Sequence, residues 1–192
     1  KFTFNSDGFT IGNLEKLISL IPESAPQVEN SLFASLAKNS SDAEQIKEIA
    51  QSYFPALLIP VLPLNILKNI LQTYPMHQKL ELISSIDEEM REKFVDVFAP
   101  KGSKASDVLD LEMEKIDTDI SAQKRIREKP DDIWKEFVLY SRKLLKNEKE
   151  GSGDLEKMIT QWSESIMSGK NPKEAVNSIN LEEDDSVTEK AA

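Results

Sequence analysis

Apolar residues recur three or four positions apart along most of this 192-residue chain, a spacing typical of amphipathic helices. Leu109, Ile116 and Ile120, for example, would share one face of a long helix that Ser103 is placed to cap. Strand-type alternation occurs only at residues 2–4, which are too few to build a sheet. The sequence therefore predicts an all-α fold with no sheet of three or more strands.

Prolines interrupt this pattern most densely between Tyr53 and Pro63. Pro55, Pro60 and Pro63 flank short apolar runs, and each proline removes a backbone donor that a long helix or a strand ladder would need. We expect a short, bent, buried helix here, which joins two helical groups. Farther along, residues 85–88 have the sequence of a capping box that opens another helix.

Composition and the positions of glycine and proline divide the chain into five segments. The Gly- and Glu-rich stretch around residues 148–153 is typical of a linker, and the last residues are too acidic and polar to form a core. The predicted segments are a first helical unit (1–50), a proline-rich hinge (51–63), a C-terminal helical domain (64–148), a linker with added helices (149–180) and a disordered acidic tail (181–192).

Several kinds of chemistry are excluded by composition. The chain has no cysteine, so a thiolate metal site is excluded, and His77 is its single histidine, so a histidine pair for zinc cannot be assembled. A net charge of -10 argues against a nucleic-acid-binding face, because phosphates repel such a surface. The densest basic run, residues 124–127, is interpreted as a solvated helix end.

Acidic residues crowd between positions 107 and 119. Helical phase spreads them around a polar face, so we interpret them as solvated, although an enzyme that binds a metal there is a rival hypothesis. Trp134 and Trp162 have apolar neighbours at helical spacing and are predicted to be core residues, with anchoring of a partner as the alternative. We predict no catalytic residue, no cofactor and no metal site. The acidic residues are Asp107, Asp110, Glu112, Glu114, Asp117 and Asp119.

Three stretches together resemble the C-terminal part of the flagellar motor switch protein FliG. Residues 12–49 are similar to that family's small helical unit, and residues 54–58 fall where the family has its aromatic hinge and the apolar segment after it. Residues 82–94 are the most specific, because they resemble a helix end, a turn and an Arg-Glu-Lys-Phe helix start. The resemblance covers roughly residues 8–148 and marks the chain as similar to a rotor subunit.

The resemblance implies an armadillo-like unit followed by a multi-helix C-terminal bundle. It also implies that rigid helix groups pivot about a hinge at Tyr53, Phe54 and Pro55. Because a unit of a few short helices buries little apolar surface alone, we expect its face to be only partly covered within one chain. The implied partner-contact residues are Leu14, Leu17 and Ile18 in the first unit and Leu64, Asn65, Lys68 and Asn69 in the bundle.

The implied role is a flagellar rotor or switch-complex scaffold that works by protein–protein docking. Its partners would be FliM-like switch proteins, neighbouring FliG-like protomers and the cytoplasmic domain of the stator, at the cytoplasmic face of the inner membrane beside the basal body. The chain departs from the family at residues 51–54, where only the final Phe of the hinge motif remains, and at residues 62–71, where Lys68 is the single charge. These departures indicate a divergent paralogue. The alternative is a helical adaptor or assembly protein unrelated to torque.

Overall fold

The computed structural model describes residues 26–39, 43–148 and 153–181, and every regular element in these ranges is helical. This confirms the predicted all-α fold. The elements are α2 (Pro26–Asn39), α3 (Ala43–Tyr53), the 3-10 helix η2 (Ala56–Val61), α4 (Leu64–Thr73), α5 (Met76–Ser85), α6 (Glu88–Phe98), α7 (Lys104–Thr118), α8 (Ile120–Glu128), α9 (Pro130–Glu148), α10 (Gly153–Met167), α11 (Pro172–Ala175) and the 3-10 helix η3 (Val176–Ser178).

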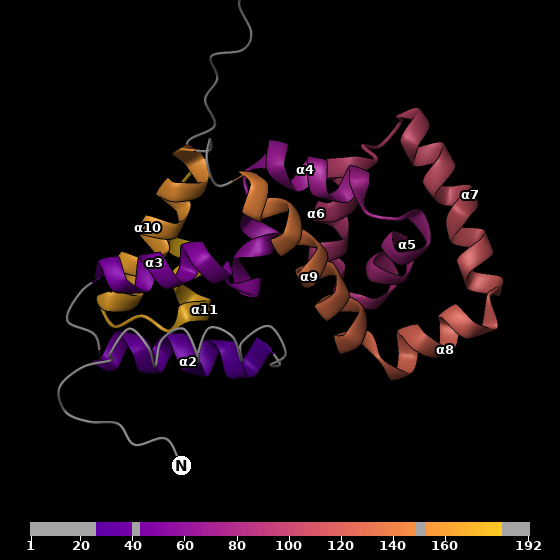
Figure 1. The fold of residues 1–192 in the computed structure, drawn as a ribbon. Coiled ribbons are helices and arrows are strands. Elements are labelled where there is room, and N and C mark those ends of the chain that lie inside the picture. The colour runs from indigo at the N-terminus through magenta and orange to yellow at the C-terminus, as the bar shows by residue number, and fades with distance from the viewer. Residues whose placement is uncertain (1–25, 40–42, 149–152, 182–192) are drawn as a thin grey trace, which may run out of the picture.

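The helices form two groups that meet at η2. Helices α2, α3, α10 and α11 lie together on one side, and α4 to α9 lie on the other (Figure 1). The 3-10 helix η2 packs against α2, α9 and η3, so it contacts both groups. Helix α3 ends at Tyr53 and α4 begins at Leu64, so regular α-helix is interrupted where the three prolines predict it.

The first group is completed by α10, which comes from the far end of the chain and packs most extensively on α3. Trp162 of α10 is fully buried and meets the ring of Phe33 of α2 edge-on, with ring centroids 4.9 Å apart. Its indole N–H donates to the carbonyl of Pro172 at 3.0 Å. The residues assigned from sequence to an added segment (149–180) thus share a core with those assigned to the first unit (1–50).

The second group is built around α5, which packs against α6, α7, α8 and α9. On α9, the fully buried Phe137 makes ring contacts with Tyr74, Phe94 and Trp134 at centroid distances of 5.1, 5.6 and 5.7 Å. These contacts bring α6 and the end of α4 onto α9. Trp134 is only half-buried, whereas Trp162 is the core residue that the sequence predicts.

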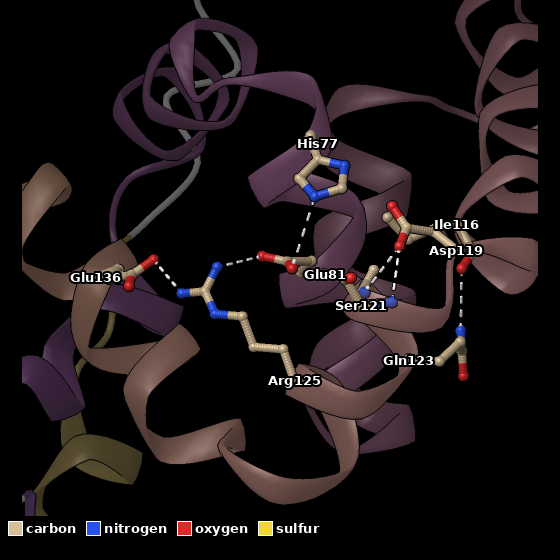
Figure 2. A network of polar contacts seen from close by, with 9 residues as sticks. His77, Glu81, Ile116, Asp119, Ser121, Gln123, Arg125 and Glu136 are labelled. Carbon is tan, nitrogen blue, oxygen red and sulfur yellow. Dashed lines mark hydrogen bonds and ion pairs between the residues drawn. The ribbon is translucent and has the colours of Figure 1, made fainter.

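A buried carboxylate also ties three helices of this group together (Figure 2). Glu81 of α5 is 2% exposed and accepts a hydrogen bond from Arg125 of α8 at 2.6 Å. The same guanidinium lies 2.5 Å from Glu136 of α9. His77 lies one turn before Glu81, at 3.6 Å, with its imidazole mostly exposed. The single histidine therefore occupies the first turn of α5, as the sequence predicts.

Helix capping differs from the prediction in two places. The cap of α6 is Asp87, whose carboxylate accepts a hydrogen bond from the amide of Met90. The hydroxyl of Ser85 instead donates to the carbonyl of Leu82 in α5. The predicted capping box at 85–88 is therefore wrong. The long helix expected from Ser103 to Ile120 is two helices, because Asp119 ends α7 and caps α8. Its carboxylate accepts from the amides of residues 121 and 122, and Ile120 is left 84% exposed.

Truncating Trp162 should destabilise the protein and free α10 from the first group. Replacing a fully buried aromatic residue by alanine costs about 3–5 kcal/mol, and Trp162→Ala also removes the hydrogen bond to Pro172. Urea unfolding should report this loss, and hydrogen exchange should become faster in α3. The exposed Ile120→Ala is the control and should change stability by less than about 0.5 kcal/mol. An unchanged exchange rate in α3 would contradict this packing role.

Candidate docking groove

An open groove of about 910 Å³ lies between the two helical groups. We call the lining residues of η2 and of the start of α4 its floor. The other lining residues come from α6, which we call one wall, and from α11, η3 and the start of α2, which we call the other wall. Trp134, from the first turns of α9, also lines the groove. The groove therefore exists only where residues from both groups come together.

The floor of the groove is apolar. Leu57 and Val61 of η2 and Met90 of α6 are half-buried, and Leu64 is 63% exposed although it is a large aliphatic residue. The prolines keep η2 a short 3-10 helix, and its side chains Leu57 and Val61 line the groove. An exposed apolar floor with polar edges is typical of surfaces that bind other proteins.

The α6 edge of the groove carries most of its charge. Glu89, Glu92, Lys93 and Asp96 follow helical spacing and are all exposed, and Lys173 lies on the other wall. Partial desolvation at the groove lowers the pKa of Lys93, against the opposing attraction of Glu89. Because these charged side chains lie along one helix, a partner bound in the groove would meet them in a line.

Glu29 of α2, one of the residues that line the groove, accepts hydrogen bonds from three donors. Its carboxylate accepts from the amide of Ala56 at 2.5 Å, the hydroxyl of Tyr53 at 3.2 Å and the guanidinium of Arg142 at 3.0 Å. Arg142, on α9, also donates to the carbonyl of Phe54 at 3.0 Å and lies 3.9 Å from the centroid of the Tyr53 ring. The two side chains thus fasten the turn between α3 and η2 to both helical groups.

Burial has the largest effect on the pKa values of Glu29 and Tyr53. It raises the pKa of Glu29 above its ordinary value, while the charge of Arg142 and the donated hydrogen bonds act in the opposite sense. Burial, with the nearby Glu29 carboxylate, also raises the pKa of Tyr53 strongly, so the phenol stays a neutral donor. Glu29 is therefore a poorly solvated carboxylate that is stabilised by one cation, Arg142, and by two further donors.

The predicted hinge coincides with this fastened turn. Tyr53, Phe54 and Pro55 are all buried, and Phe54 has φ of +48°, a left-handed conformation that non-glycine residues seldom adopt. The hydrogen bond from Arg142 to the Phe54 carbonyl holds that conformation. Sequence reasoning located the turn but missed Glu29 and Arg142, because neither residue lies in a motif that marks the pairing.

The predicted partner-contact residues fall into two sets. Leu14, Leu17 and Ile18 lie outside the described residues. In the second set, all four residues are exposed on one side of α4, and the opposite side supplies buried aliphatic residues to the core. Of these four, Leu64 also lines the groove. The second set is Leu64, Asn65, Lys68 and Asn69.

The acidic cluster is distributed as its helical phase predicts. Asp107, Asp110 and Glu114 are exposed on α7, and Asp119 is occupied as the cap of α8. Within the ranges that the structure describes, no three histidine or acidic side chains converge so as to hold a metal ion. The same ranges contain no helix whose length and hydropathy would suit a membrane span.

Comparison with known proteins leaves the family open. No protein family, curated protein or solved structure matches the chain.

Removing the cation of the buried pair should destabilise the protein in a pH-dependent way. Arg142→Met leaves the Glu29 carboxylate buried without a counter-ion, which costs about 3–5 kcal/mol. Because Arg142 lowers the pKa of Glu29, its loss raises that pKa further above 4.5. The native state then binds the proton more tightly than the unfolded chain, so stability falls as pH rises from 4.5 through the raised pKa.

Urea unfolding relative to wild type should therefore show a smaller loss at about pH 5 than at about pH 7.5. Adding Glu29→Gln to Arg142→Met removes the buried charge and should recover part of the stability at the higher pH. An equal loss at both pH values would show that Glu29 is not the titrating group.

Proposed function

We propose that this protein is a docking scaffold, which binds a partner protein in the groove between its two helical groups and performs no catalysis of its own. The observation that carries the proposal is the groove itself. It is open to solvent, it has an apolar floor, and it is preformed by the buried contacts of the lining residue Glu29. Preformed surfaces bind with a smaller loss of conformational entropy than surfaces that must be ordered first.

The floor and the α4 face together define the proposed contact surface. Leu64 belongs to both, since it lines the groove and also stands beside Asn65 and Lys68 on the exposed side of α4. A partner that covers Leu64 would bury an aliphatic side chain that is now in contact with water, which favours association. Helix-in-groove recognition relies on apolar anchors of this kind.

A charged residue on the groove floor should abolish docking without unfolding the protein. Leu64→Glu places a carboxylate where a partner would exclude water, while the 63% exposure of the site keeps its effect on stability within about 0.5 kcal/mol. Co-purification from the native organism should lose the partners that wild type retains. Val108→Glu, at a 49% exposed site on α7, is the matched control and should retain them. Retention by both variants would contradict docking at the groove.

A second, more specific proposal places this scaffold in a flagellar switch complex. It rests on the sequence resemblance to FliG, and it is favoured by the exposure of the four α4 residues that the resemblance assigns to partner contact. In this role the chain would be peripheral to the inner membrane at the basal body. It would bind FliM-like switch proteins, neighbouring FliG-like protomers and the stator.

The rotor proposal predicts recovery of switch proteins but no torque. Exposed ion pairs are individually worth about 0–1 kcal/mol and act only in sum, and residues 62–71 provide only Lys68. We expect the protein to co-purify with switch-complex proteins, yet not to restore swimming in a strain that lacks the ordinary torque-bearing protein. Lys68→Ala should leave motor torque nearly unchanged. Robust rescue of swimming would assign the chain to the main rotor role, and absence of every switch protein would favour an unrelated adaptor.

A further inference from the structure

The rim of the docking groove is anionic along α6. Glu89, Glu92 and Asp96 recur at helical spacing on its α6 wall, and Asp87 stands at the start of the same helix. All four carboxylates are exposed. Two lysines, one on each wall, are the only cations among the lining residues. A partner segment that lies over the floor must therefore approach a row of carboxylates.

Apolar side chains lie directly beside this row. Met90 and Val97 of α6 lie next to the acidic residues in sequence and line the same groove, which continues into Val61 and Leu64 on the floor. A helix has the matching periodicity, because residues three and four apart can present an apolar stripe with charged residues at its margin. The groove thus offers apolar contacts and negative charge at the same helical period.

We propose that the groove selects a helical segment of a separate protein, one that carries lysine or arginine beside an apolar stripe. This inference rests on the docking function proposed above and names the chemistry of the partner. The apolar stripe would cover Leu57, Val61 and Leu64, and the cationic margin would pair with Glu89, Glu92 and Asp96. Charge complementarity of this kind steers association and rejects acidic competitors.

Residues 1–25 and 182–192 each carry more acidic than basic side chains. Residues 1–25 contain two lysines and three acidic residues, and residues 182–192 contain one lysine and five acidic residues. A second copy carries the same net charge of -10, which opposes close approach of two identical acidic surfaces. These charges favour a cationic segment from a different protein over either of these segments or a second copy.

Two designed peptides of about 18 residues, or roughly five helical turns, test this selection. Both have the same leucine stripe, lack tryptophan and carry a fluorescent label; the polar margin is lysine in one and glutamate in the other. Fluorescence anisotropy with the full chain should show roughly tenfold or tighter binding of the lysine peptide, weakening as salt rises from about 0.05 to 0.5 M. Equal binding of the two peptides would overturn the proposal.

Charge reversal locates the contact. The triple variant Glu89→Lys, Glu92→Lys, Asp96→Lys should weaken binding of the lysine peptide by roughly tenfold or more, because three exposed attractions become repulsions. A matched triple variant on α7, with lysine at positions 107, 110 and 114, changes the net charge equally. It should retain most of the affinity, and equal weakening by the two triple variants would mean that bulk charge alone attracts the peptide. The milder pair Glu92→Gln, Asp96→Asn should give an intermediate loss and serves if the triple variant fails to fold.

Trp134 reports occupancy of the groove directly. It lines the groove and is half-buried, so the lysine peptide should change its emission, and Trp134→Phe should abolish that change while anisotropy still detects binding. Binding without any change in emission from wild type would place the peptide elsewhere and overturn the proposal. If Leu64→Glu abolishes recovery of natural partners while the two peptides bind equally, docking at the groove stands and selection of a cationic helix falls.

Discussion

The ion pair between Glu29 and Arg142 is the contact on which the arrangement of the two helical groups depends. The two residues are 113 positions apart, and their side chains meet beneath the only turn that joins α3 to η2. Ala56, Phe54 and Tyr53 all hydrogen-bond to one member of the pair. A buried ion pair adds little net stability over apolar packing, but breaking it is costly, so it fixes one geometry.

That geometry also explains why a proline-rich segment can be buried. Prolines reduce the number of backbone donors, and the Ala56 amide at the start of η2 is satisfied by the Glu29 carboxylate. With its first residue fixed, η2 presents Leu57 and Val61 to the groove floor. Pivoting of the two groups about this turn would have to separate a carboxylate and a guanidinium that are both largely buried. The buried ion pair therefore favours a fixed arrangement of the two helical groups over a free joint.

The second polar network connects helices of one group only. Glu81, Arg125 and Glu136 join α5, α8 and α9, all within the second group, and they leave the groove untouched. They fasten α5, which packs against α6, to α8 and α9. The two networks together make the proposed docking surface a property of the whole bundle. Neither α6 nor η2 would present that surface if isolated from its neighbours.

The sequence by itself determined the helical class and the turn around Tyr53 and Pro55, because helical periodicity and proline chemistry act over a few neighbouring residues. Tertiary structure alone decided that α10 completes the first group and that Glu29 meets Arg142. It also decided that α6, η2 and α11 enclose a groove. These contacts join residues that are far apart in the chain. They depend on how whole helices pack, and the spacing of apolar residues within one helix does not specify that packing.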